Sequence, residues 1–410
     1  MKKTIIAVLT LAFSIATYAQ NDNRITIGII DTVQSTILNE KRKILVHVPK
    51  QSSSVVLSQQ TYPVVYVLDG DAHFNSVVSM IQRLSQVSVS PEMIVVGISN
   101  TNRTRDLTPT KSGDDPFLGK ISNLSVNTSG GGETFISFIE KELIPYINSK
   151  YPTQPYKILI GHSFGGLTVM NALINHTKLF NTYIAIDPSM WWDDLNFLKA
   201  TKKALATKDL TGTTLYVGIA NTIDDDMAIQ EILKDTTLDI RGIRAVMEMD
   251  DLIKTQKPKG LKYASKYYKN DSHNSVTLIA AYDALRYIFE DYEFRIRNKD
   301  VLDSTVAFAE KFKVRYQKVS KLFGYEVKPP EMEINTFGYR FLQRKQFKKA
   351  EDLFKLNREN YPASFNVYDS YGDFFVEKGD KVKAMENFEK ALSIKENEAT
   401  RNKLNKLKSQ

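Results

Sequence analysis

A six-residue turn, Gly161-His162-Ser163-Phe164-Gly165-Gly166, constrains the fold of this chain more than any other feature. It follows an apolar run at residues 157–160 and precedes an amphipathic stretch at residues 167–175. Strand, tight turn and helix in this order form the context that a G-x-S-x-G nucleophile elbow requires. The glycines are needed because side chains two positions either side of the serine would collide with the neighbouring strand and helix. The pattern predicts a nucleophilic Ser163, against the alternative of a glycine-rich turn without chemistry.

A nucleophilic serine needs a histidine base, and the chain has five histidines. In folds with this elbow the base follows the serine along the chain, which removes His47 and His73. His162 belongs to the elbow, and its side chain should diverge from that of Ser163. His176 lies in the same predicted helix, about 20 Å further along at 1.5 Å per residue. Elimination leaves His273, in a polar loop before a helical run, as the base.

The acid that orients this histidine is expected just after the strand at residues 214–220. Asp224 stands nearest to that strand end and is the favoured candidate. The same residues could instead form a solvated acidic loop. Asp193, Asp194 and Asp271 are further candidates, and a Ser–His dyad without a carboxylate is also open.

Two turns are expected to supply the oxyanion hole. Phe164 follows the nucleophile at a helix N-terminus, where backbone N–H groups point toward developing negative charge. The second donor should come from the turn after the buried apolar run at residues 64–68, around Gly70 and Asp71. A plain Asp-Gly turn is the alternative.

The first residues are predicted to be a secretory signal peptide. Lys2 and Lys3 give the positive start, residues 4–15 the apolar core, and cleavage is expected after Ala19. The apolar segment is too short for a membrane span. Cysteine is absent from the sequence, which excludes disulfides, a catalytic thiol and cysteine-ligated metal. We therefore expect a periplasmic or secreted protein that needs no metal and no cofactor.

The formal net charge of +8, with a pI near 9.1, raises the question of nucleic-acid binding. No basic run with interleaved aromatic residues occurs, and export argues further against such a partner. We expect a small-molecule substrate and no nucleic acid.

Apolar runs alternate with helical patterns through residues 24–289. Two strands precede the alternation, so we expect an α/β fold whose mostly parallel sheet has an antiparallel edge and helices on both faces. The long polar segment at residues 99–134 is expected to form part of the cleft wall. The candidate strands are residues 25–30, 43–48, 64–68, 93–98, 157–160, 183–186 and 214–220, and the candidate helices are residues 72–86 and 134–149.

A repeat follows the break at Pro329 and Pro330. Its period of 34 residues is that of the tetratricopeptide repeat, in which small and aromatic residues recur at helix contacts. We expect a signal at residues 1–19, a hydrolase-type domain at 20–300, a linking helix and linker at 301–330 with the helix at 301–322, and repeats at 331–410. The repeats either support the fold or bind a protein partner. The matched pairs are Gly338 and Gly372, Phe341 and Phe375, Ala350 and Ala384, and Phe354 and Phe388.

Six motifs in residues 25–289 resemble those of the bacterial putative esterase family, which includes enterochelin esterase-like and feruloyl esterase-like α/β-hydrolases. The resemblance implies an α/β-hydrolase fold, hydrolysis of a carboxylic ester, Ser163 as nucleophile and His273 as base. The motifs are STILNEKR at residues 35–42, YPVVYVLDG at 62–70, RDLTP at 105–109, GHSFGG at 161–166, DPSMWW at 187–192 and DSHNSV at 271–276.

The chain departs from this family at two positions. Such families often carry a Gly-x-Glu-like acid site after the strand that ends near Ala220, where Asn221 and Thr222 stand here. Asp187 stands where a serine is common. The resemblance therefore does not supply the acid.

Trp191 and Trp192 follow one strand end, and Arg103 and Arg105 follow another. Aromatic walls with a cation would suit an aromatic or catecholate acyl ester, and we expect Arg105 and the two tryptophans to bind substrate. Alternatively, the tryptophans fill the core and Arg105 pairs with a local carboxylate.

We therefore expect an exported serine esterase that forms an acyl-enzyme on Ser163, with siderophore esters and aromatic acyl esters as candidate substrates. The alternative is an inactive hydrolase scaffold that binds a partner through its repeats.

Overall fold

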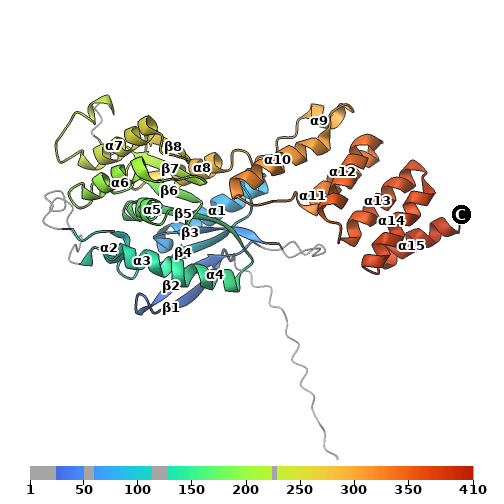
Figure 1. Ribbon diagram of the computed structural model, residues 1–410, viewed down its shortest axis with the longest axis horizontal. Coiled ribbons are helices and arrows are strands. Elements are labelled where there is room, and N and C mark those ends of the chain that lie inside the picture. Colours follow the sequence, from blue (N-terminus) through green and yellow to red (C-terminus); the bar gives the residue numbers. More distant parts are fainter. Residues whose placement is uncertain (1–24, 50–59, 113–127, 224–228, 410) are drawn as a thin grey trace, which may run out of the picture.

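The computed structural model describes residues 25–49, 60–112, 128–223 and 229–409 (Figure 1). The predicted signal peptide and Asp224 lie outside these residues. The described chain forms a sheet with helices on both faces, followed by an all-helical extension (Figure 1).

The sheet has eight strands in the order β1-β2-β4-β3-β5-β6-β7-β8. β2 pairs antiparallel with β1 and with β4, and all other neighbours are parallel. The expected mostly parallel sheet with an antiparallel edge is confirmed. The strands are β1 (Ile29–Ser35), β2 (Glu40–His47), β3 (Tyr62–Val67), β4 (Ile94–Ile98), β5 (Thr153–His162), β6 (Thr182–Ile186), β7 (Thr213–Ala220) and β8 (Leu261–Tyr268).

The two edge strands were the poorly predicted ones. β1 begins at Ile29 rather than at residue 25, and β8 was not predicted at all. Both are partly exposed strands in which polar residues interrupt the apolar ones, so neither presents the continuous apolar run of a buried strand.

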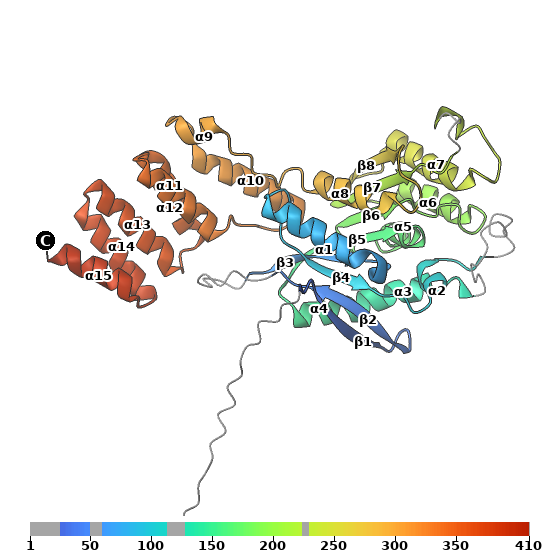
Figure 2. The same ribbon diagram turned by 180° about the vertical axis from the view of Figure 1, so that it is seen from behind.

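Alternate residues of a strand point to opposite faces, so β3 contributes to two cores. Val64 and Tyr66 pack into one core, and Val65 and Val67 into the other. Views from the two sides show α5 over one face and α1 over the other (Figures 1 and 2). The first core holds α3 (Gly132–Phe138), a π-helical turn (Ile139–Leu143), α4 (Ile144–Lys150), α5 (Phe164–Asn175), α6 (Asn196–Thr207) and α7 (Arg241–Gln256), and the second α1 (Gly70–Gln86) and α8 (Val276–Ile288).

The predicted helix at residues 301–322 is two helices, α9 (Asn298–Leu302) and α10 (Phe308–Phe323). Asp303 ends α9, and its carboxylate accepts a hydrogen bond from the N–H of Thr305 at 2.9 Å. Such a local side-chain bond competes with helix continuation.

The extension consists of two helix pairs and a final helix. A Cβ on Gly338 would lie 2.6 Å from the ring of Phe354, and one on Gly372 would lie 2.5 Å from the ring of Phe388. The same close contact, 34 residues apart, is what helical repeats require. The helices are α11 (Glu331–Gln343), α12 (Phe347–Asn360), α13 (Phe365–Lys378), α14 (Lys381–Ile394) and α15 (Glu398–Lys408).

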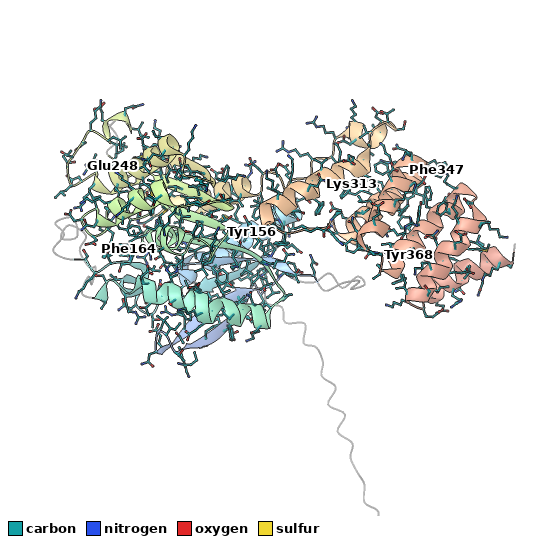
Figure 3. All side chains as sticks on the ribbon, viewed as in Figure 1. Tyr156, Phe164, Glu248, Lys313, Phe347 and Tyr368 are labelled. Carbon is teal, nitrogen blue, oxygen red and sulfur yellow. The ribbon has the colours of Figure 1, made fainter. Side chains whose placement is uncertain are left out.

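Helix α10 belongs to two cores. Phe308 and Phe312 pack among the helices of the extension, whereas Val319 and Phe323 pack against the sheet domain. The ring of Tyr156, labelled in Figure 3, stacks on that of Phe323 with centroids 4.7 Å apart. The extension is therefore joined to the sheet domain through buried side chains of α10 and not through a linker alone.

Candidate active site

Ser163 occupies a sharp turn between β5 and α5. β5 ends at His162, α5 begins at Phe164, and Ser163 has φ 60° and ψ −118°. Non-glycine residues adopt such a conformation at a cost of about 1–3 kcal/mol, and it is held only where the surroundings enforce it. The N–H of Ser163 donates to the carbonyl of Ile186 at 3.0 Å, which ties the turn to the end of β6.

The glycines around Ser163 are needed sterically. A Cβ on Gly161 would lie 2.3 Å from the carbonyl of Gly165, so the two sides of the turn touch directly. A Cβ on Gly166 would lie 2.9 Å from Cα of Pro188. The structure therefore has the close backbone approach that the sequence pattern predicts for a nucleophile elbow.

Within the described residues, the carboxylate that contacts His273 belongs to Asp187, whereas the favoured candidate Asp224 lies outside these residues. His273 Nδ1 lies 2.6 Å from Oδ2 of Asp187, and Oδ1 of the same carboxylate accepts the N–H of Ala220 at 3.1 Å. Asp187 follows β6 directly and is buried. Both carboxylate oxygens thus have partners, which fixes the side chain in a position to orient the imidazole.

Two of the three further acid candidates pair with other residues. Asp194 pairs with Arg241 at 2.8 Å, and Asp271 accepts a hydrogen bond from Ser275 at 3.1 Å. For Asp193 the described part of the chain contains no contact with His273. The available signal for Asp187 was its place in the DPSMWW motif, immediately after the strand beside the nucleophile strand.

Ser163 and His273 line the same cavity, which has a volume of about 510 Å³. Ser163 Oγ lies 3.4 Å from Oγ of Ser189, and within the described residues it makes no hydrogen bond to His273. Catalytic hydrogen bonds are often long in unliganded enzymes and shorten when substrate binds. The cavity is lined by Asp69, Asp71, Ala72, His73, Asn100, Arg103, His162, Ser163, His273 and Asn274.

The predicted oxyanion residues lie at two helix N-termini. Phe164 is the first residue of α5, and Gly70 and Asp71 are the first two residues of α1. N–H groups in a first helical turn have no partner within the helix and can bind an anion. A Cβ on Gly70 would lie 2.6 Å from backbone atoms of Gly97 and Ile98, so only glycine fits there.

The substrate-binding predictions for Arg105, Trp191 and Trp192 are not supported, because none of them lines this cavity. Both tryptophans are buried in the core, and Nε1 of Trp192 donates to the carbonyl of Thr110 at 3.1 Å. Arg105 pairs with Asp106 at 2.7 Å and with Glu40 at 3.1 Å.

His162 joins the elbow to the loop that carries His273. Its Nε2 lies 2.7 Å from the carbonyl oxygen of His273, and because a carbonyl only accepts, Nε2 carries the proton. Burial, with a contribution from the charge of His273, lowers the pKa of His162 from 6.5 to about 4. The ring is therefore neutral near pH 7.

This lowered pKa makes the stability of the protein depend on pH. Between pH 6.5 and 4 the unfolded chain binds a proton at His162 that the folded chain does not, so stability falls as pH decreases through this range. The contribution is about 3 kcal/mol. His162→Gln keeps a donor for the His273 carbonyl and should flatten this part of the pH profile, measured by urea unfolding at pH 4 to 7. An unchanged slope would contradict the assignment.

In the part of the chain that the structure describes, no cluster of three or more histidine or carboxylate side chains could hold a metal ion. Nor does any of the described helices combine the length and apolar character needed to cross a membrane.

The model of the putative esterase family matches residues 35–273, more than half of the chain. The chain belongs to this family. The match covers strands β2 to β8 and includes Ser163, Asp187 and His273.

Curated relatives of this chain include siderophore esterases. It is 25% identical over 264 residues to the siderophore triacetylfusarinine C esterase of Aspergillus fumigatus, across 57% of this chain and 83% of the relative. It is 33% identical over 153 residues to the ferri-bacillibactin esterase BesA of Bacillus subtilis, across 34% of this chain and 52% of the relative.

Solved structures show the same fold. An IroE-like serine hydrolase from Shewanella oneidensis has a TM-score of 0.67 and 30% identity, covering 81% of this chain and 99% of that chain. A protein from Capnocytophaga ochracea has a TM-score of 0.60 and 20% identity, covering 93% of this chain and all of the other. The second likeness extends the shared fold into the C-terminal helices. Together with its family, these relatives make the protein a carboxylic ester hydrolase.

Proposed function

We propose that this esterase cleaves its substrate through an acyl-enzyme on Ser163. The contact of 2.6 Å between His273 Nδ1 and Asp187 Oδ2 carries the proposal, because it leaves Nε2 of His273 free to act as the base, and His273 and Ser163 line the same cavity. Nε2 takes the proton from Oγ of Ser163 as Oγ bonds to the ester carbonyl carbon. The protonated imidazole then gives this proton to the alcohol oxygen as its bond to carbon breaks.

Water completes the reaction. Nε2 of His273 takes a proton from water as its oxygen attacks the acyl carbon, and the proton returns to Oγ of Ser163 as the acid is released. In both steps the N–H groups of Phe164 and of the Gly70–Asp71 turn stabilise the negative charge on the former carbonyl oxygen. Donors fixed at helix N-termini need no reorganisation when this charge develops.

The substrate class we propose is an ester of the siderophore type. The relatives named above include a siderophore esterase, and the cavity is lined largely by polar side chains, which suits an oxygen-rich molecule. Export through a signal peptide at residues 1–19 would place the enzyme where such molecules are handled outside the cytoplasm.

The test is hydrolysis of p-nitrophenyl esters of short, long and aromatic acids, and of a catecholate trilactone, by the protein without residues 1–19. We expect turnover that disappears when Ser163 or His273 is replaced by alanine, with the trilactone preferred. Turnover of simple esters without the trilactone would remove the siderophore proposal and leave the mechanism intact. No turnover of any ester would favour the scaffold alternative.

A further inference from the structure

A buried carboxylate lies beside the proposed oxyanion hole. Asp69 precedes α1, adopts φ 52°, and lines the cavity of Ser163. Its Oδ2 lies 3.3 Å from where a Cβ on Gly165 would be, so the carboxylate faces the first turn of α5. This turn also contains the N–H of Phe164. A negative charge here opposes the formation of a second negative charge on the substrate oxygen.

Arg103 pairs with this carboxylate through two nitrogen atoms. Nε lies 2.7 Å from Oδ1 of Asp69 and Nη2 lies 3.0 Å from Oδ2, and Nδ2 of Asn100 also donates to Oδ1 at 2.5 Å. The guanidinium carbon lies 5.3 Å from the centre of the Phe164 ring. A two-point arginine–carboxylate contact fixes both charge and geometry, which a lysine cannot reproduce.

A buried ion pair holds the short helix that carries Arg103. In α2 (Arg103–Leu107), Asp106 is fully buried and contacts Nη2 of Arg42 at 2.8 Å. Nη1 of Arg42 donates to the carbonyl of Ser99 at 3.0 Å. Two of the motifs singled out in the sequence, at residues 35–42 and 105–109, thus meet in this buried pair and hold Arg103 in place.

We propose that Arg103 is a positioning residue that neutralises Asp69, so that the oxyanion hole meets no net negative charge during catalysis. The inference rests on the proposed acyl-enzyme mechanism and adds a residue to it. Asp69 in turn holds the guanidinium of Arg103 over the ring of Phe164. On this account Arg103 acts on the transition state through Asp69 and need not touch the substrate.

A double-mutant cycle with a small neutral ester, p-nitrophenyl acetate, tests this inference. Arg103→Gln should lower kcat by about 10- to 100-fold with KM changed by less than about threefold, because it leaves the carboxylate uncompensated. Adding Asp69→Asn to Arg103→Gln should restore most of the lost kcat. Asparagine is the replacement of choice because it tolerates the left-handed conformation of position 69.

Two further variants complete the experiment. Arg103→Lys keeps the positive charge and should lose less kcat than Arg103→Gln, which separates charge from folding. Arg401→Gln breaks an exposed pair with Glu396 far along the chain and should leave kcat unchanged. Thermal unfolding of every variant checks that it is folded.

If Asp69→Asn does not restore the kcat that Arg103→Gln loses, the inference is wrong. It is also wrong if Arg103→Gln changes only KM. Ser163→Ala is measured beside these variants. If turnover depends on Ser163 but the double variant does not recover kcat, only the proposed role of Arg103 is overturned. Turnover that survives Ser163→Ala would overturn both this role and the proposed function.

Discussion

Ser163→Ala is expected to lower kcat for any ester substrate by about 10⁴- to 10⁶-fold. Alanine cannot form the acyl bond, so only noncovalent catalysis, by the oxyanion donors and by positioning of the substrate, would remain. The residue is held at φ 60° and ψ −118° by contacts of the surrounding backbone, and alanine can be placed there without new atoms. Stability should therefore change little, and steady-state kinetics with p-nitrophenyl esters measures the loss.

Ser189→Ala is the matched control. Oγ of Ser189 lies 3.4 Å from Oγ of Ser163, so this variant removes a neighbouring hydroxyl without removing the proposed nucleophile. Loss of one hydrogen bond should cost no more than about tenfold in kcat. Equal losses in the two variants would contradict the assignment of the nucleophile to Ser163.

Asp187→Asn is expected to lower kcat by about 10²- to 10⁴-fold with little change in KM. The amide can present an N–H where the carboxylate accepts from Nδ1 of His273, which favours the wrong tautomer of the imidazole. It also cannot stabilise the imidazolium that forms when Ser163 loses its proton. The effect should be seen in kcat measured near pH 8, with unfolding by urea as the check on stability.

Asp271→Asn serves as the control for this variant, because Asp271 is a nearby carboxylate that contacts Ser275 instead. It should keep kcat within a few-fold of the unmodified protein. If Asp187→Asn were as mild as Asp271→Asn, the enzyme would work as a Ser–His dyad and Asp187 would have only a structural role.

The elbow and the proposed base His273 could be predicted because few local sequences and few histidine positions are compatible with such a turn. Gly161 and Gly165 touch through their backbones, so the turn restricts the local sequence strongly. Only one histidine lies after the elbow at a position that can return to it. The structure brings Ser163 and His273 to one cavity.

The proposed acid, Asp187, could not be predicted in the same way. Its contact joins positions 86 residues apart, and it depends on how the chain turns after β6. The sequence rule that places the acid after a later strand directed attention to Asp224 instead. The orientation of Asp187 depends on its φ of 41° and on the bond to Ala220, neither of which a sequence pattern indicates.

Trp191 and Trp192 were predicted at the cleft for a related reason. Their position after a strand end is compatible with a place either in the cleft wall or in the core. Which place they take depends on how their rings pack, which the sequence does not indicate. Here both rings lie against Phe164, with centroids 6.1 Å and 5.1 Å away, and support the elbow from the core side. Among the described residues that line the cavity, Arg103, two residues before Arg105, is the cation.

Labelling with a fluorophosphonate, followed by peptide mass spectrometry, tests the central claim most directly, since only an activated serine reacts readily with this reagent. We expect one adduct on the folded protein, on Ser163, and its disappearance in His273→Ala. Ser163 left unmodified, or modified equally in the presence and absence of His273, would contradict the proposed mechanism.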